Sequence, residues 1–349
     1  MSKTNPGNYF EDFRLGQQLV HATPRTVGEG DVALYTALYG GRFALVSADS
    51  FAQRLGLPQS PLDDLLVFHI VFGKTVPDIS LNAVANLGYA ACIFGVPVYP
   101  GDTLRTTSSV IGLRENSNKQ SGVVYVRSTG RNQNDETVLD YARWVMVRKR
   151  SEAAASPGNE VPKLPALVTP DLLQTPEHLR FDDYDQALAG SADRWGDYTA
   201  GEKIDHADGM TIEEAEHALA TRLYQNTARV HFNQHSEKSG RFGKRLIYGG
   251  HIMSLARALS FNGLANAQRI LAINAGSHVA PSFAGDTIYA WSEVLDKAEL
   301  PGRGDCGALR LRTIAAKDHA CGDFPAKGGE GKYHPAVVLD LDYWVLMPR

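Results

Sequence analysis

Residues 196–226, GDYTAGEKIDHADGMTIEEAEHALATRLYQN, repeat the pattern of residues 11–41, EDFRLGQQLVHATPRTVGEGDVALYTALYGG. Gly16 corresponds to Gly201, and the same offset aligns a threonine and a tyrosine in each stretch. Similarity at a fixed offset is typical of a duplicated unit. This stretch decides the fold, because two copies of one unit are expected to build the same structure twice.

Two further pairs of stretches follow in the same order. VPVYPGDTLRTTSSVIGL (96–113) matches VAPSFAGDTIYAWSEVLD (279–296), and the two halves close alike, with VLDYARWVMVRKR (138–150) and VLDLDYWVLMPR (338–349). Three matches in one order are more than chance supplies. The chain is therefore a duplicated domain.

The duplication predicts an N-terminal domain at 1–150, a linker at 151–195 and a C-terminal domain at 196–349. The linker opens with SEAAASPGNEVPKLPALVTP (151–170), which is rich in Pro, Ala and Ser and has no helical periodicity. A chain of 349 residues is also too long for one small core.

Each copy predicts the same order of elements. A first helix opens at a capping threonine, Thr26 or Thr211, and Glu214 completes a capping box in the second copy. A second helix follows, over LDDLLVFHIVFGKTV (62–76) in the first copy and GGHIMSLARALSFNGLA (249–265) in the second. It is apolar almost all round, which is typical of a helix enclosed by a sheet.

Strands follow the helices in each copy. In the first copy they are TLRTTSSVIGL (103–113), GVVYVRSTGR (122–131) and VLDYARWVMVR (138–148). This order predicts an α+β fold in which an antiparallel sheet covers one apolar helix. Together with PVYPGDTL (97–104) and PSFAGDTI (281–288), the pattern resembles the hotdog fold of the MaoC-like acyl-CoA dehydratases. The resemblance implies a double hotdog over essentially the whole chain.

The hydratase motif of that family runs approximately G-D-x-N-P-L-H and lies between the overhanging helix and the central one. Here QNTARVH (225–231) occupies that place. His231 matches the motif histidine, and Asn226 stands where the family usually has aspartate. The family then has a glycine that opens the central helix; Gly250 is the match, with Gly249 beside it.

Adding water across an enoyl thioester requires a base, a proton for the α-carbon and a donor for the enolate-like oxygen. The resemblance implies that His231 is the base, that Asn226 orients the water or the imidazole, and that the Gly250 N–H stabilises the oxygen. An asparagine cannot be a general base, so either His231 does all the proton work or a carboxylate such as Asp205 or Asp208 contributes. The plainer alternative is that Asn226 caps a helix and His231 is a buried structural histidine.

The first copy lacks all three of these groups. At the offset that relates Gly16 to Gly201, the asparagine, the histidine and the glycine fall on Gly41, Val46 and Leu65. We therefore expect one active site per chain. The resemblance implies that the first copy helps to house the acyl chain.

Three arginines lie close to the motif. Arg229 replaces the family's proline two residues before the histidine, and Arg222 and Arg245 are near it in sequence. Together they predict a substrate with a free carboxylate besides its thioester. Any one of them can instead be solvated or pair with Glu214 or Glu237.

Three longer stretches narrow the substrate further. NAVANLGY (82–89), LATRLYQNTARVHFN (219–233) and GKRLIYGGHIMSLARALSFNGL (243–264) resemble the mesaconyl-CoA hydratase branch of the family, whose members interconvert mesaconyl-CoA and water with β-methylmalyl-CoA. Two other functions stay open: a hotdog thioesterase, which needs an acidic residue that the central helix lacks, and a non-catalytic acyl-CoA-binding protein.

The totals exclude several classes of protein. A net charge of -4 argues against nucleic-acid binding, and no apolar stretch reaches the roughly 18 to 20 residues of a membrane helix. The start of the chain has no apolar signal region, and the three cysteines form no CxxC pair. These features predict a cytoplasmic protein without a cysteine zinc site.

No cofactor motif is present, so we expect coenzyme A only as part of the substrate. KDHACGDFPAKGGEGKYHP (317–335) gathers His319, Cys321, Asp323 and His334, but its composition predicts a hairpin loop and no metal site. The resemblance alone implies a homo-oligomer, with a dimer favoured.

Overall fold

The structure, a computed structural model, describes residues 3–349. Its strands in the first copy are β1 (Gln18–Thr26), β2 (Ala83–Phe94), β3 (Thr103–Glu115), β4 (Ser121–Arg131) and β5 (Thr137–Arg148). After the short β6 (Asn159–Glu160), the strands of the second copy are β7 (Lys203–Thr211), β8 (Arg269–His278), β9 (Thr287–Glu299), β10 (Cys306–Lys317) and β11 (Val337–Pro348).

The helices follow the duplication as well. Those before the linker are α1 (Glu29–Tyr39), α2 (Ala44–Ser47), α3 (Asp49–Arg54), α4 (Asp64–Thr75) and the π-helical turn η2 (Val76–Ser80). Those after it are α6 (Glu214–Leu223), α7 (Arg229–Phe232), α8 (Gln234–Glu237), α9 (Gly249–Leu259) and α10 (Phe261–Leu264). The starts of α2 and α7, and those of α4 and α9, are related by the predicted offset between the copies.

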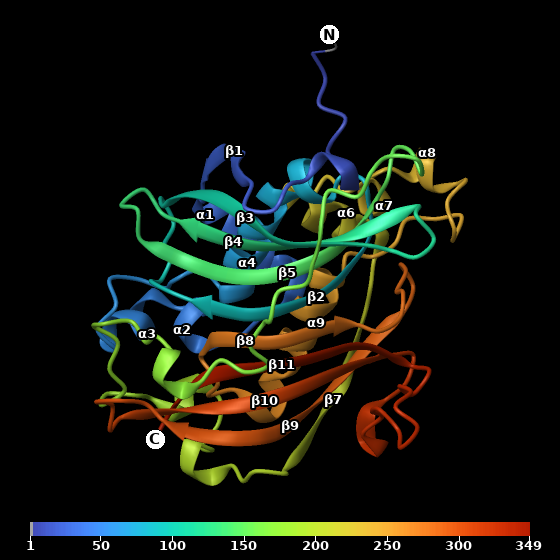
Figure 1. Ribbon diagram of the computed structural model, residues 1–349. Coiled ribbons are helices and arrows are strands. Elements are labelled where there is room, and N and C mark those ends of the chain that lie inside the picture. Colours follow the sequence, from blue (N-terminus) through green and yellow to red (C-terminus); the bar gives the residue numbers. More distant parts are fainter. Residues whose placement is uncertain (1–2) are drawn as a thin grey trace.

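One antiparallel sheet runs through both copies. Its order is β1-β3-β4-β5-β2-β8-β11-β10-β9-β7, and β6 pairs with β3 outside this path. Each copy therefore has the same internal strand order, and the two halves join where β2 pairs with β8. Figure 1 shows the first copy's strands above and the second copy's below, with α4 and α9 behind the sheet.

The two central helices pack against the sheet, α4 against strands of the first copy and α9 against strands of the second. Every residue of α4 is buried, and α9 is buried along most of its length. Both helices belong to one apolar core, which continues from Phe68 in α4 to Ile252 in α9 and Tyr343 in β11. The predicted α+β arrangement, a sheet over an apolar helix in each copy, is confirmed.

The predicted caps of the first helices were wrong. Thr26 and Thr211 end strands β1 and β7, where each threonine hydroxyl hydrogen-bonds to a threonine hydroxyl of the neighbouring strand at 2.7 and 2.8 Å. The helix α6 begins two residues later than a Thr211 cap requires, after Glu213, and has no side-chain cap. Glu214 instead forms an ion pair with Arg245. Threonine suits both a cap and a strand, and here strand pairing prevails.

The linker packs against the sheet. Its β6 pairs antiparallel with the end of β3, and the backbone carbonyl of Val168 accepts a hydrogen bond from Trp344 Nε1 at 3.0 Å. Further along, Leu179, Phe181 and Tyr184 are buried in a second apolar cluster on the face of the sheet away from α4 and α9. The linker, in light green, crosses that face in Figure 1.

The segment 317–335 forms the predicted hairpin loop between β10 and β11. Within residues 3–349 no group of three or more histidine, cysteine and acidic side chains is arranged to hold a metal ion. Among the same residues, no helix is both long and apolar enough to cross a membrane.

Candidate active site

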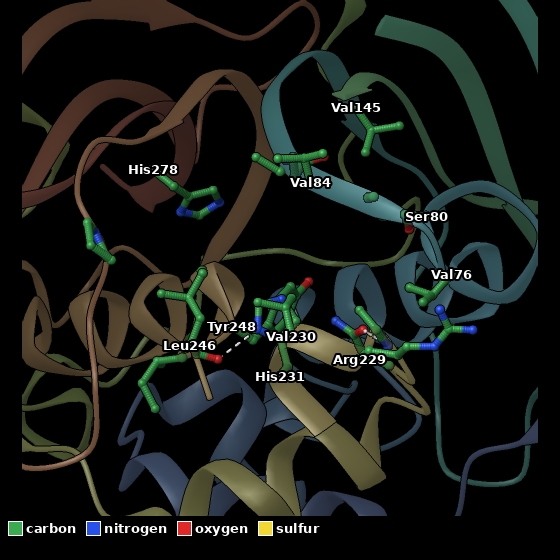
Figure 2. A pocket seen from close by; sticks show the side chains of 18 of the residues that line it. Val76, Ser80, Val84, Val145, Arg229, Val230, His231, Leu246, Tyr248 and His278 are labelled. Carbon is green, nitrogen blue, oxygen red and sulfur yellow. Dashed lines mark hydrogen bonds between the residues drawn. The ribbon is translucent and has the colours of Figure 1, made fainter. Parts of the chain in front are cut away.

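A cavity of about 760 Å³ lies where the two copies meet. The first copy lines it from the end of α4, η2, β2 and β5, and the second copy from the segment after α6, the start of α9 and the end of β8. Figure 2 shows these two sides, with Val76, Ser80, Val84 and Val145 facing His231, Leu246, Tyr248 and His278.

Asn226 is 1% exposed and lines this cavity. Gln225 leaves the helical conformation with φ of 54°, and the Asn226 N–H then donates to the Thr221 carbonyl at 2.9 Å. The side-chain oxygen of Asn226 accepts from the Ala228 N–H at 3.2 Å. Among residues 3–349 no group pairs with its Nδ2, so the amide keeps a free donor beside the cavity. Asn226 thus both fixes the chain before α7 and offers a donor.

His231 lies in α7 and also lines the cavity. Its Nδ1 hydrogen-bonds to the Leu246 carbonyl at 2.8 Å, as the dashed line in Figure 2 shows. A carbonyl only accepts, so Nδ1 carries the proton and Nε2 of the neutral ring has a free lone pair. Burial lowers the pKa of His231 to about 4, against the opposing effect of the Leu246 bond. The ring is therefore neutral at pH 7, with its basic nitrogen available.

Two glycines open α9 after Tyr248. Within the described residues no protein group accepts from their N–H groups, since the first helical bond of the turn joins His251 to Tyr248. A side chain at Gly249 would place its Cβ 2.4 Å from the ring of His278, and one at Gly250 would lie 2.4 Å from that of Tyr248. Gly249 borders the cavity, and Gly250 is buried behind it. The positive end of α9 is thus open to an anion.

Arg229 lines the cavity, but it does not share a direction with His231. Residues two apart on a helix point to different sides, and α7 is helical where an extended segment would have aligned them. The Arg229 Nη1 donates to Asn82 Oδ1 of the first copy at 3.1 Å. Figure 2 shows Arg229 on the side of Val76.

The other two arginines lie outside the cavity lining. Arg222 is exposed on α6. Arg245 forms an ion pair with Glu214, which is the pairing that the sequence offered as the alternative to binding a substrate carboxylate. Asp205 and Asp208 are exposed on β7, and neither lines the cavity. The acidic side chain that does line it is Glu237, in α8.

Two cavity residues, His278 and Arg143, were not predicted from the sequence. His278 ends β8, and its Nε2 lies 3.2 Å from the Tyr89 hydroxyl. Burial lowers the pKa of His278 to about 4, and His231 adds to the shift. Arg143 occupies an inward position of β5, between the buried Tyr141 and Val145. A charge at an apolar position of a strand was the signal that could have found it.

A buried network behind the cavity joins the two copies. The Tyr39 hydroxyl bonds to the Tyr224 hydroxyl and to His251 Nδ1, both at 2.7 Å. His69 Nε2 of α4 lies 2.9 Å from the Ser254 hydroxyl of α9. Burial lowers the pKa values of His69 and His251 to about 3, so both rings are neutral. The network fixes α9 against the first copy.

Known proteins share this fold and much of this sequence. The sequence profile described as mesaconyl-CoA hydratase matches residues 2–327. The chain belongs to the mesaconyl-CoA hydratase family. Relatives in this family include the β-methylmalyl-CoA dehydratase of Chloroflexus aurantiacus, 68% identical over 100% of this chain and 99% of the relative, and the mesaconyl-CoA hydratase of Cereibacter sphaeroides, 62% identical over 99% and 100%.

Solved structures agree with this assignment. A putative MaoC domain protein dehydratase from Chloroflexus aurantiacus superposes with a TM-score of 0.98 at 67% identity, covering 100% of this chain and 99% of the other. A conserved protein of Mycobacterium tuberculosis with a double hotdog fold gives a TM-score of 0.78 at 25% identity, covering 99% of each chain. The predicted double hotdog fold of a MaoC-like protein is confirmed. In this member of the mesaconyl-CoA hydratase family, both hotdog units belong to one chain.

Proposed function

We propose that this chain catalyses the reversible hydration of mesaconyl-CoA to β-methylmalyl-CoA, the reaction named by its relatives of 62 and 68% identity. The observation that carries the proposal is His231, whose Nδ1 is held by the Leu246 carbonyl while Nε2 is left free at the cavity. A neutral imidazole oriented in this way is a general base for water.

Asn226 and His231 have complementary roles in this mechanism. The Asn226 Nδ2 donates to the oxygen of a water molecule, and the water donates one proton to His231 Nε2. The remaining lone pair of the water attacks the β-carbon of the enoyl thioester. Because Asn226 cannot accept that proton, His231 does the proton work alone.

The N-terminus of α9 receives the charge that develops. As the C–O bond forms at the β-carbon, the alkene electrons move toward the thioester oxygen, which the N–H groups of Gly249 and Gly250 stabilise. The protonated His231 then gives its proton to the α-carbon. One O–H bond and the π bond of the alkene are broken, one C–O and one C–H bond are formed, and the imidazole returns to its starting state.

The chain's own groups supply every step, so we propose that the enzyme needs no cofactor or metal. Coenzyme A enters as part of the substrate. Dialysis against EDTA should leave the hydration rate unchanged, and a rate restored only by an added metal would contradict this. We also propose that the protein is cytoplasmic and forms a homodimer. Light scattering would measure the mass of this assembly.

The deciding experiment follows hydration and CoA release together, with mesaconyl-CoA as substrate. We expect loss of the alkene absorbance without free thiol. Release of CoA would indicate a thioesterase, although Glu237 is the acidic residue among those that line the cavity and it lies in α8, not α9. Binding without either reaction would indicate a non-catalytic acyl-CoA-binding protein.

A further inference from the structure

Arg143 is a buried cation in the wall of the cavity. It is 1% exposed, lies on β5 of the first copy and lines the cavity. The guanidinium carbon is 4.2 Å from the centre of the Phe72 ring in α4. A buried charge is costly unless an anion or a full set of hydrogen bonds meets it.

The protein satisfies this guanidinium only in part. Nη2 donates to the hydroxyls of Thr75 and Ser80 at 2.7 and 3.3 Å, whereas Nε has no partner. Among residues 3–349 no carboxylate pairs with Arg143, and the ionisable groups that act on it are the tyrosines Tyr89, Tyr141 and Tyr248. These phenols are neutral at pH 7, because burial raises their pKa values.

Two other buried arginines of this protein have acidic side chains near their guanidinium groups. Arg269 forms a buried ion pair with Asp64. Arg257 donates to the Ala267 carbonyl and is close enough to Asp63 for the two charges to attract. Arg143 differs from both, because no acidic side chain within residues 3–349 acts on it and because it lines the cavity.

Arg143 lies on the side of the cavity where the reaction is proposed to occur. Its stacking partner Phe72 precedes Gly73, whose missing side chain lets α4 touch the backbone at Tyr224 and Asn226. A Cβ on Gly73 would be 1.8 Å from the Tyr224 carbonyl oxygen and 3.5 Å from the Asn226 nitrogen. Phe72 also packs against Tyr248, with ring centres 5.7 Å apart.

We propose that Arg143 binds the free carboxylate of the substrate and thereby selects a dicarboxylic acyl thioester. This inference rests on the proposed hydration of mesaconyl-CoA. In β-methylmalyl-CoA the hydroxyl is on the carbon that also bears the free carboxylate, so an anchor for that carboxylate positions the carbon that water attacks. The terminal Nη1 has no hydrogen-bond partner among residues 3–349, so it is the nitrogen free to donate to a carboxylate oxygen in a charge-assisted hydrogen bond.

The residues around Arg143 fit the rest of the acyl group. Phe72, Val76 and Val145 give the cavity an apolar wall beside the guanidinium, which suits the methyl branch. Arg229, in contrast, is exposed and already bonded to Asn82. The carboxylate-binding role predicted for Arg229 is therefore reassigned to a residue of the other copy.

The test compares two thioesters that differ in one group. Mesaconyl-CoA carries the carboxylate, and trans-2-methyl-2-butenoyl-CoA carries a methyl group in its place. For Arg143→Met we expect kcat/KM for mesaconyl-CoA to fall about 30-fold or more, the cost of removing one partner of a buried charged pair. The rate with the methyl analogue should change less than about threefold. Arg143→Lys, which keeps the charge, should lose less on mesaconyl-CoA than Arg143→Met.

Arg148→Gln is the matched control, because Arg148 is exposed on the same strand at the cavity and both thioesters carry the same CoA. Any loss it causes should be equal for the two substrates. Equal losses for Arg143→Met, or no loss, would overturn the proposal. A protein that folds normally is expected, since replacing an unpaired buried charge by an apolar side chain is often stabilising.

Binding of saturated analogues separates this inference from the proposed reaction. Calorimetry with methylsuccinyl-CoA and 2-methylbutanoyl-CoA requires no catalysis. We expect Arg143→Met to weaken the first about 30-fold or more and the second hardly at all. If the wild-type protein hydrates no mesaconyl-CoA, the proposed function fails, whereas the difference between the two affinities still decides the role of Arg143.

Discussion

The central helices α4 and α9 occupy equivalent places, yet within the described residues only α4 has a protein acceptor for one of its first two backbone N–H groups. In α4 the Leu65 N–H donates to the carboxylate of Asp63 at 2.8 Å, and Asp64 is engaged by Arg269. In α9 the equivalent positions are Tyr248, Gly249 and Gly250, which provide no carboxylate. Within the described residues, the protein therefore closes the start of α4 with its own carboxylate and leaves the start of α9 without an acceptor.

The positions of a cation and an aromatic ring are also interchanged between the two copies. In the first copy Arg143 of the strand β5 stacks on Phe72 of the helix α4. In the second copy the corresponding strand residue is Tyr343 and the corresponding helix residue is Arg257. The exchange moves the charge from the strand to the helix. Duplication has thus produced one scaffold with two different sets of groups at the cavity: the second copy presents the His231 imidazole and the open end of α9, and the first presents a buried cation.

The largest effect should come from His231→Ala, which removes the proposed general base from the second copy. The hydration rate should fall about 10²- to 10⁴-fold, as is typical when a general base is lost. Steady-state assays with mesaconyl-CoA would measure it, with circular dichroism to confirm folding. His235→Ala, an exposed histidine four residues away, is the control and should keep the wild-type rate. A folded His231→Ala variant at full rate would remove His231 from the mechanism.

Closing the open helix end should be nearly as harmful. A methyl group at Gly249 would lie 2.4 Å from the ring of His278, so Gly249→Ala must displace His278 or the thioester oxygen. We expect kcat to fall about 10²-fold, comparable to the loss of one oxyanion donor. Gly30→Ala in α1 makes the same change where no atom lies within 4 Å, and its activity should be unchanged. Equal activities would mean that the start of α9 does not meet the substrate.

Asn226→Asp tests whether the free amide donor matters. The carboxylate keeps the hydrogen bond to the Ala228 N–H, so stability should hardly change, but its second oxygen accepts where Nδ2 donated. The new charge also repels the substrate carboxylate. We expect a rate about 10-fold lower at an unchanged melting temperature. An unaltered rate would leave Asn226 with its turn-forming role alone.

A lower pH should destabilise the buried network behind the cavity before it destabilises the β1 edge of the sheet. His217 of α6 belongs to the same region, because its Nε2 accepts a hydrogen bond from the Tyr248 N–H at 3.0 Å. Burial lowers the pKa of His69 and His251 to about 3 and that of His217 to about 2, below the unfolded value near 6.5. The unfolded chain therefore binds more protons below pH 6.5, and stability falls as the pH falls. The free energy of unfolding should fall by about 1 to 2 kcal/mol for each of these rings when the pH is lowered from 7 to 5.

Hydrogen exchange at the two pH values would locate this loss. The strand β1 is the internal comparison, because it is the outermost strand of the first copy, whereas β2 of that copy pairs with β8. Amides of α9 and β8 should lose protection at pH 5 before those of β1 and β3. A uniform loss along the sheet would contradict this.

The smallest expected difference concerns the number of ligand molecules bound per chain, which should be one and not two. Because Gly41, Val46 and Leu65 replace the three reactive groups in the first copy, methylsuccinyl-CoA should saturate at one equivalent per chain. Titration calorimetry with a known concentration of active protein would measure this. Two equivalent sites would show that the helix α4 also receives a ligand, despite its Asp63 cap.

Apart from β1, β2 and their counterparts β7 and β8, which it did not indicate, the sequence by itself determined the duplication, the order of helices and strands in each copy, and the relation of Asn226, His231 and the glycine pair to one short motif. These are local or periodic features, and the constant offset that aligns α4 with α9 is readable without coordinates. The linker's composition, in contrast, did not indicate that it packs on the sheet, because burial depends on the surface that it meets.

Only the tertiary structure decided which side chains share the cavity. Arg143 and His231 belong to different copies and reach one space because β2 pairs with β8 and α4 packs against α9. Arg229 is two residues from His231, yet one turn of helix points it elsewhere. Proximity in sequence does not fix direction, because a side chain's direction follows from the local backbone and its partners from the packing of distant elements.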